Sequence, residues 1–560
     1  MNVEEILLFL LATAAVIVTV RLVADKTGLP SAALLTVIGV VYAVLPGHNV
    51  TLEPDIVLTF VIPPLLYSAA LDSSLLAIRR NLRTVVSLSV VLVLATSLLI
   101  GVLFGLLVAG ATVAAGVALG AAVAPPDPVA ALAVGRKVGL PPHLITLIQG
   151  EGLLNDATAL TTLSVAVAAV NGAGFSMPLA VGKFALAAAG GVVAGVAVAY
   201  LVRLLRPISG DPLIANAISL VTPFLAYLVG EELHVSGVLA VVVAGLMIGH
   251  DAPRRASGAS RLQTGAVWRL VDFLLEGFVF LLIGQQLPEV VRGLAAYDGP
   301  TIAVAVAVTL AVTLLLRPAW LALTQLLPRS LHTRLGGSDD GADGAGRPTK
   351  AGGSSANARL GGREVVVLSW AGTRGVITLA AIFTLPVLTP DGTPFPDRDL
   401  LLFCAFLVVL VTLLGQGITF APLVRALGLR ADETDQARLR NEARSAAVRA
   451  ALTRLAELRD AGEDEDGQPV DQGALDHLQA QLRTRLERYQ GRLELLENAA
   501  PGAPPRSSRY EAALRLRRAV IAAEREELLR WRDAGKLPDA GLRILARELD
   551  HEEGLLPDRR

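Results

Sequence analysis

Two acidic residues lie inside an apolar stretch that carries no other charge. The stretch 144–170 contains the sequence GEGLLND, which holds Glu151 and Asp156. A charged side chain at the centre of a membrane span costs roughly 2.5–3.5 kcal/mol on insertion scales, so it indicates a functional site by default. On a helix with about 100° per residue, Glu151 shares a face with Asn155, whereas Asp156 lies about 140° from Glu151. We therefore expect the two acids to have different partners, one being neutralised by a base and the other binding a cation or a proton. The simpler alternative is a pair of structural ion pairs.

A third acid, Asp127, lies among prolines in the stretch 112–134. Pro125, Pro126 and Pro128 have no backbone N–H, and their rings obstruct the preceding helical turn. A regular helix cannot continue through this point. Backbone carbonyls freed at membrane depth are tolerated only where they line a cavity or bind something. The sequence thus predicts a broken helix with Asp127 at the break, and the alternative is a proline kink with a hydrogen-bonded aspartate.

The candidate base is Arg374, in the middle of the stretch 364–386. Gly372, Thr373 and Gly375 surround it, and glycine weakens a helix. This is a second candidate break, seven spans after the first. An odd offset makes the two broken helices cross the membrane in opposite directions. Inverted repeats have this arrangement, in which broken helices meet near the midplane to form an ion site.

The rest of the chain is strongly apolar up to about residue 430. Hydrophobic residues make up 53% of the 560 and charged residues 18%, whereas soluble domains carry about a quarter charged residues. A membrane-spanning helix needs roughly 20 apolar residues. We count thirteen apolar segments that are candidates for such helices: 3–24, 29–46, 54–72, 84–109, 112–134, 144–170, 178–202, 212–230, 235–250, 265–287, 301–326, 364–386 and 399–424. We expect an all-α polytopic membrane protein of about 13 transmembrane helices, with inverted repeats and crossed broken helices.

Loop charges predict the orientation and the domains. Lys and Arg are concentrated in alternate loops, which the positive-inside rule places in the cytoplasm. An odd number of spans then puts the N-terminus outside and the C-terminus inside. We expect a transmembrane domain at 1–426 with a flexible cytoplasmic loop at 328–363. Residues 427–560 are expected to form a cytoplasmic helical domain, either a solvated bundle or dimer contact or, as the alternative, a regulatory sensor.

The remaining polar residues give weaker signals. Asp272 and Glu276 lie one turn apart in one span, and Arg317 precedes a proline in the next. We expect these three to lie near helix ends, paired or reaching the membrane surface. The single cysteine, Cys404, and the scattered histidines show no metal-ligand spacing, so neither a cofactor nor a resident metal is expected.

Four motifs together resemble a known family. They are PPLLY at 63–67, PDP at 126–128, GEGLLND at 150–156 and GTRG at 372–375. In order and spacing they are similar to those of bacterial monovalent cation/proton antiporters related to sodium/hydrogen exchangers. The resemblance extends over about 420 residues, which is the whole predicted membrane part.

This resemblance implies a thirteen-helix fold with a mobile core domain and a dimerising domain. It makes Asp156 the carboxylate that binds the cation and accepts the proton, with Asp127 close by and Asn155 stabilising the site. It also implies that Glu151 pairs with Arg374. An Asn-Asp pair marks the electroneutral members of the family, and a homodimer in the cell membrane is expected.

Three positions depart from the family's common pattern. Pro126 stands where Thr or Ser usually precedes Asp-Pro, Gly152 where many relatives have Ser, and Ser68 where relatives carry an acid. Each of these can supply or arrange an ion ligand in relatives. Na⁺ is the first expectation for the transported cation, and Li⁺ and K⁺ remain open.

Three other functions are alternatives to cation/proton exchange. A channel would need a pore lined by carbonyl rings or like charges, and no filter-like repeat is present. An intramembrane hydrolase would need a nucleophile–base pair or a metal set, which the motifs do not supply. A membrane sensor signalling through the tail stays open, because only ion flux distinguishes it. The net charge of −1 gives no indication of nucleic-acid binding.

Overall fold

The structure is a computed structural model that forms two compact units, residues 1–430 and 431–560. It describes residues 3–27, 30–44, 57–170, 177–205, 211–326, 360–431, 433–463, 467–497, 508–534 and 536–554. Residues 328–359 of the predicted flexible loop at 328–363 lie outside the described residues.

The first unit is a bundle of apolar helices. In chain order they are α1 (Val3–Thr27), α2 (Ser31–Val44), η1 (Val57–Val61), α4 (Ile62–Leu71), α5 (Leu75–Arg80), α6 (Leu82–Val86), η2 (Ser87–Val91), α7 (Leu92–Leu107), α8 (Val113–Val123), α9 (Pro128–Val138), α10 (Pro142–Val170), α11 (Met177–Leu205), α12 (Pro212–Glu232), α13 (Gly237–Arg255), α14 (Gly258–Gly293), η4 (Leu294–Ala296), α15 (Gly299–Leu326), α17 (Gly362–Trp370), α18 (Val376–Phe383), α19 (Arg398–Val411), η5 (Thr412–Gln416) and α20 (Gly417–Ala426).

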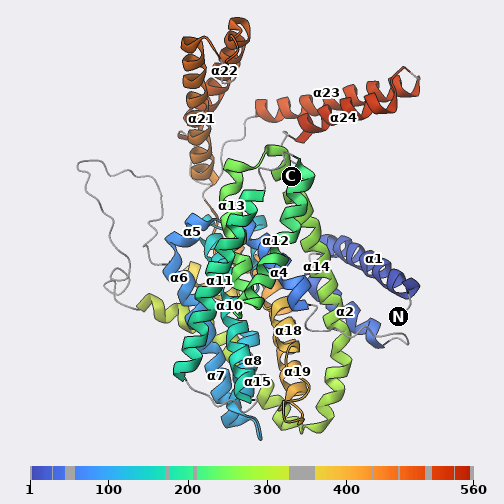
Figure 1. Cartoon of the computed structure of the whole chain (residues 1–560), viewed down its shortest axis with the longest axis vertical. Helices are drawn as coiled ribbons and strands as arrows, with labels where there is room; N and C mark the ends of the chain where they lie inside the picture. The colour runs from blue at the N-terminus through green and yellow to red at the C-terminus, as the bar shows by residue number, and fades with distance from the viewer. Residues whose placement is uncertain are drawn as a thin grey trace, which may run out of the picture. The chain divides into compact units, whose positions relative to one another are not determined.

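Every one of the thirteen predicted apolar stretches contains helix, and the polytopic all-α fold is confirmed. Among the described residues, seven helical segments are long and apolar enough to cross a bilayer, and α2, α8 and the segment Thr59–Leu71 are shorter apolar helices. The longest helix is α14, with 36 residues. Figure 1 shows α1 and α2 lying beside α14, whereas α7, α8 and α15 lie together elsewhere in the bundle.

Small residues bring the helices of the bundle into close contact. The Cα atoms of Gly39 on α2 and Gly284 on α14 face one another, so a side chain at either position would overlap the partner helix. Gly116 and Gly120 on α8 lie against the backbone of α7 in the same way. Helices in lipid associate through such close packing, because the hydrophobic effect does not distinguish their faces from the acyl chains.

The two expected helix interruptions are present. The fifth predicted span is divided into α8 and α9 by residues 124–127, and the twelfth into α17 and α18 by residues 371–375. Pro128 occupies the first turn of α9, where a missing N–H costs nothing. Its neighbours Pro125 and Pro126 cannot continue α8, which explains why the chain breaks here.

The second unit consists of amphipathic helices, as the spacing of its leucines predicts. It contains α21 (Glu433–Ala461), α22 (Gln472–Glu497), α23 (Ser508–Asp533) and α24 (Asp539–Gly554). Helices α21 and α22 pack together, and Leu475 and Leu496 are buried. Arg525 on α23 pairs with Asp550 at 2.7 Å and with Glu553 at 2.8 Å on α24. These pairs are exposed, so they contribute little to stability.

Candidate ion-binding site

The two helix interruptions meet and hydrogen bond to each other. The backbone N–H of Asp127 donates to the carbonyl oxygen of Thr373 at 2.7 Å. In return the Thr373 hydroxyl donates to the carbonyl oxygen of Asp127 at 3.0 Å. Each interruption therefore satisfies backbone groups that the other leaves without a helical partner, as the interior of a bilayer requires.

Helix N-termini converge on the Asp127 carboxylate. Its Oδ1 accepts from the backbone N–H of Val129 at 2.9 Å, which caps α9. Its other oxygen packs directly against the Cα of Gly375, the residue before α18, where any side chain would overlap it. Because a helix N-terminus carries about half a positive charge, both half-helices favour a negative charge at Asp127. Gly375 is thus required as glycine for close approach.

Arginines cap the opposite ends of the broken helices. Arg374 donates through Nε to the carbonyl oxygen of Val123 at the end of α8, at 2.7 Å, and through Nη1 to Gly372. Arg317 on α15 donates through Nε to the carbonyl oxygen of Leu368 near the end of α17, at 2.9 Å. The C-terminal ends, which carry partial negative charge, therefore face cations while the N-terminal ends face Asp127.

The expected ion pair between Glu151 and Arg374 is wrong as a direct contact. Glu151 pairs with Arg317, whose Nη1 and Nη2 both donate to the carboxylate, the second at 2.8 Å. Both side chains are buried, at 2% and 4% exposure. Arg374 lies close enough to interact electrostatically with both partners, but its donors are taken by backbone carbonyls. The physical reason is that both terminal nitrogens of Arg317 match the two carboxylate oxygens, whereas Arg374 donates to the carbonyls of Val123 and Gly372.

Asn155 and Asp156 face the meeting point of the broken helices from α10. Asn155 is fully buried, and its Nδ2 donates to the carbonyl oxygen of Pro126 at 3.0 Å. Its Oδ1 is buried without a partner among the described residues. Asp156 is 3% exposed and interacts electrostatically with Asp127.

Two of the three positions that depart from the family pattern make close contacts. Gly152 lies against the ring of Pro128, so a side chain at position 152 would require the proline or its helix to shift. Ser68 on α4 donates to Asp272 on α14 at 2.7 Å. A carboxylate therefore lies beside position 68 although the residue at that position is not acidic. Glu276, one turn further along α14, interacts electrostatically with both Asp127 and Asp272.

The structure thus brings Asp127, Asn155, Asp156 and Thr373 together, as the sequence indicated. Sequence reasoning missed Arg317, which it placed near a helix end although the residue is 3% exposed in mid-helix. One signal could have revealed it: Pro318 follows it inside α15, and prolines also mark the interruption at Asp127.

The comparisons with known proteins agree with this geometry. The family model described as the transmembrane sodium/hydrogen exchanger matches residues 11–426. The chain belongs to the sodium/hydrogen exchanger family. It is therefore a multi-pass membrane transporter that exchanges a monovalent cation for H⁺.

Three relatives illustrate the range of this exchanger's similarities. An uncharacterised Na⁺/H⁺ exchanger of Mycobacterium tuberculosis is 31% identical over 99% of this chain and 96% of its own length. A sodium, potassium, lithium and rubidium/H⁺ antiporter of Bacillus subtilis is 32% identical over 49% of this chain and 39% of its own. The solved sodium proton antiporter of Methanocaldococcus jannaschii shares the fold at a TM-score of 0.59 and 19% identity, covering 76% of this chain and 99% of that one.

Proposed function

We propose that the exchanger works by competition between H⁺ and a monovalent cation at the carboxylate of Asp156. The observation that carries this proposal is a nearly buried carboxylate that interacts with a second acid, Asp127, and lies next in the chain to Asn155, whose buried Oδ1 has no partner among the described residues. Burial disfavours the charged form, so the free anion is driven to take either a proton or a cation. It cannot hold both at once. Alternating exposure of the loaded site to the two sides then moves one proton against one cation.

Two neighbouring groups are proposed to complete the cation site. Asp127 supplies a second carboxylate, and Asn155 supplies an amide oxygen that no described residue satisfies. Oxygen ligands of this kind suit alkali cations. The Asn155 amide, which is always neutral, leaves Asp156 as the acid that exchanges its proton. We therefore propose electroneutral one-for-one exchange.

Na⁺ is the proposed substrate, with Li⁺ and K⁺ as alternatives. The family description supports sodium, and the Bacillus subtilis relative is named for sodium, potassium, lithium and rubidium. The departures at Pro126 and Ser68 change groups that arrange the cation in relatives, so a broad selectivity would be consistent with this site.

We also propose that the exchanger is a homodimer in the plasma membrane, with its N-terminus outside and residues 427–560 in the cytoplasm. The distribution of Lys and Arg among the loops supports the orientation. The resemblance to sodium/hydrogen exchangers supports the dimer and the division at about residue 426.

The test is proton flux in proteoliposomes with a preset pH gradient, to which Na⁺, Li⁺ and K⁺ are added in turn. Wild type is expected to collapse the gradient with at least one cation, and Asp156→Ala and Asp156→Asn are expected to abolish the response. Asp298→Ala, which removes an exposed carboxylate outside the spans, is the matched control and is expected to transport normally.

A truncation after residue 430 is expected to retain exchange, because the site lies wholly within the first unit. Exchange at the wild-type rate by Asp156→Ala would refute the site assignment. No response to any cation at any pH would favour the channel or sensor alternatives. A potential-dependent rate in wild type would refute electroneutrality.

A further inference from the structure

Helices α11 and α13 are in tight contact at one end and separate at the other. In the middle of α11, Gly190 and Gly191 lie against Val235 and Ser236, which immediately precede α13, and the Ser236 N–H donates to the carbonyl oxygen of Ala187 at 3.1 Å. Gly195 continues this contact against the backbone of α13. Beyond Gly195 the facing residues are no longer glycine. A cavity of about 260 Å³ opens there, between residues 199–203 of α11 and 247–255 of α13.

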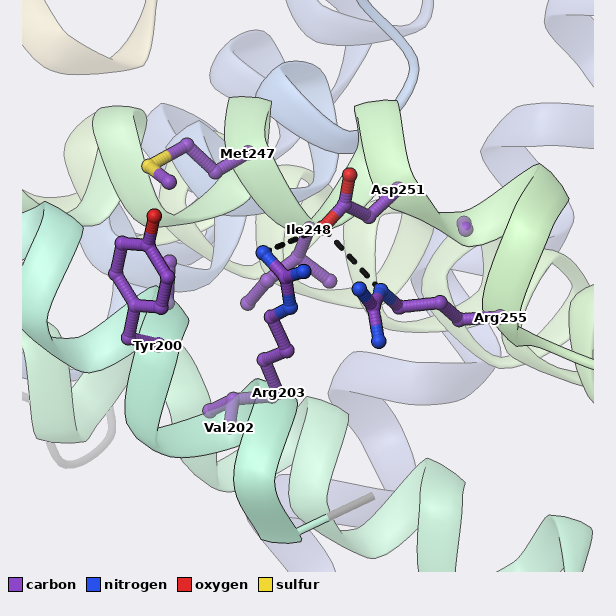
Figure 2. A pocket seen from close by; sticks show the side chains of 9 residues that line it. Tyr200, Val202, Arg203, Met247, Ile248, Asp251 and Arg255 are labelled. Atoms are coloured by element: carbon purple, nitrogen blue, oxygen red, sulfur yellow. Dashed lines mark ion pairs between the residues drawn. The ribbon is translucent and has the colours of Figure 1, made fainter. Parts of the chain in front are cut away.

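Two arginines and one aspartate form the polar side of this cavity. Figure 2 shows Arg203 and Arg255 pointing toward Asp251 from two directions. The nearest nitrogen–oxygen distances are 3.8 Å from Arg203 and 3.5 Å from Arg255. Both exceed the usual 2.7–3.2 Å of a hydrogen bond, so Asp251 does not saturate the guanidinium donors. Two positive charges against one negative charge leave an excess of one positive charge in the cavity.

Apolar groups form the rest of the cavity and continue onto the outside of the helix. Val202 and Ile248 line the cavity, and the guanidinium of Arg203 lies 5.5 Å from the ring centre of Tyr200. The adjoining surface of α11 carries Leu204, which is 71% exposed. In a membrane transporter, an exposed leucine on a spanning helix faces acyl chains. The cavity thus joins a cationic pocket to a surface that contacts lipid tails.

The position of the cavity along the membrane indicates which leaflet it faces. Arg203 lies in the last turn of α11, and Arg255 is the last residue of α13. Arginines at these helix ends belong to the loops that the positive-inside rule assigns to the cytoplasm. The cytoplasmic leaflet is the one that carries anionic lipids in excess, and basic pockets between spans on that side bind their headgroups.

We propose that the cavity between α11 and α13 binds the phosphate of an anionic phospholipid, with Arg203 and Arg255 as its ligands. Two guanidinium groups converging on one point match the geometry of a phosphate, which accepts paired N–H donors. The acyl chains of the lipid would follow the exposed leucines of α11. This site is separate from the proposed exchange site, and its test does not depend on transport.

The experiment measures the thermal unfolding midpoint of the full chain in neutral detergent. Dioleoylphosphatidylglycerol, dioleoylphosphatidylcholine and inorganic phosphate are titrated separately. Phosphatidylglycerol is expected to raise the midpoint in a saturable manner. Phosphatidylcholine and inorganic phosphate are expected to do so only weakly, since the first lacks net charge and the second lacks acyl chains.

Variants identify the cavity as the site. In Arg203→Gln/Arg255→Gln the apparent affinity for phosphatidylglycerol is expected to fall about tenfold, since each basic residue contributes about 1 kcal/mol and Asp251 offsets part of it. Ala252→Leu fills the cavity without changing charge and is expected to weaken binding as well, even if the double variant fails to fold. Arg254→Gln removes a charge from the neighbouring position outside the cavity and is expected to bind normally.

Other outcomes overturn the proposal. Equal shifts with phosphatidylglycerol and phosphatidylcholine would show that the site does not select an anionic headgroup. An equal shift with inorganic phosphate would make it an anion site rather than a lipid site. A loss in Arg254→Gln as large as in the double variant would show that only the general surface charge matters.

Discussion

Asp127 and Thr373 cap one another: the backbone N–H of Asp127 donates to the Thr373 carbonyl oxygen, and the Thr373 hydroxyl donates to the Asp127 carbonyl oxygen. Thr373→Val keeps the shape of the side chain and removes the hydroxyl, leaving the Asp127 carbonyl without its donor. Loss of one hydrogen bond destabilises the folded site by about 1 kcal/mol. We therefore expect the exchange rate in proteoliposomes to fall roughly fivefold. Thr373→Ser restores the hydroxyl and should exchange nearly normally. Equal rates in the valine and serine variants would contradict a role for this bond.

The pairing of Glu151 with Arg317 makes a double-mutant test possible. Removing one partner of a buried ion pair costs about 3–5 kcal/mol because the other charge stays buried and unpaired. Glu151→Gln and Arg317→Gln are each expected to lower the thermal unfolding midpoint in detergent, and the double variant should unfold at a higher temperature than either single variant.

Arg374 provides the matched control for this test. Its donors bond to Val123 and Gly372, so Glu151→Gln should not rescue Arg374→Gln. If Glu151→Gln rescued Arg374→Gln and did not rescue Arg317→Gln, the result would favour the pairing of Glu151 with Arg374 that the sequence first suggested.

Asn155→Asp is expected to make exchange more sensitive to alkaline pH. The Asn155 amide donates to the carbonyl of Pro126, and a protonated aspartate can also donate, whereas an ionised one cannot. Ionisation would also add a negative charge beside Asp156. The rate of the variant relative to wild type should therefore be lower at pH 8.5 than at pH 6.5, measured as cation-dependent proton flux. A ratio that does not change with pH would count against this contact.

Gly152→Ser is expected to destabilise the exchanger. A side chain here would meet the ring of Pro128, whose Cδ lies 2.8 Å from the position of the added Cβ. Overpacking of this kind costs about 1–3 kcal/mol. The thermal midpoint should fall, and Pro128→Ala should recover part of the loss in the double variant. A serine variant as stable as wild type would show that α9 moves aside easily.

Asp397→Asn is expected to stabilise the protein at neutral pH. Asp397 lies just before α19 with a φ of 53°, a conformation that asparagine also adopts, and its carboxylate hydrogen bonds to Tyr297. Burial raises the pKa of the Asp397 carboxyl above its usual value. A raised pKa means that ionisation opposes folding, so stability is lost as pH rises from the unfolded-state value of about 4.

The midpoint of Asp397→Asn should thus exceed that of wild type at pH 7.5, and the difference should shrink toward pH 4. Asp391→Asn, in the same loop, is the control and should give no such pH-dependent gain. A constant difference at all pH values would show that ionisation of Asp397 is not the cause.

The spans and the breaks could be predicted because their causes are local. A spanning helix can be recognised from the length and hydropathy of a single stretch of about 20 residues. Pro125, Pro126 and Pro128 prevent a regular helix by their own chemistry, whatever surrounds them. The helical wheel of α10 likewise separated Glu151 from Asp156 without tertiary information.

The partner of Glu151 could not be predicted in this way. A wheel gives the direction of a side chain but not which of two distant arginines reaches it. Arg317 on α15, expected near a helix end, neutralises Glu151. Arg374, expected to pair with Glu151, donates instead to the carbonyl oxygen of Val123 at the end of α8. The contact between Ser68 and Asp272 is also long-range, so neither residue alone indicates it.

The length of α14 limits how far this helix can tilt in the bilayer. Arg269 and Arg292 lie on it 23 residues apart, which at a rise of 1.5 Å corresponds to about 35 Å. The hydrocarbon layer is about 30 Å thick, so a tilt beyond roughly 30° would draw one guanidinium into it. Asp272 lies only about 4.5 Å from Arg269 along the axis. We therefore expect the two arginines to lie at opposite water boundaries, with the Ser68–Asp272 contact one turn from the boundary at Arg269.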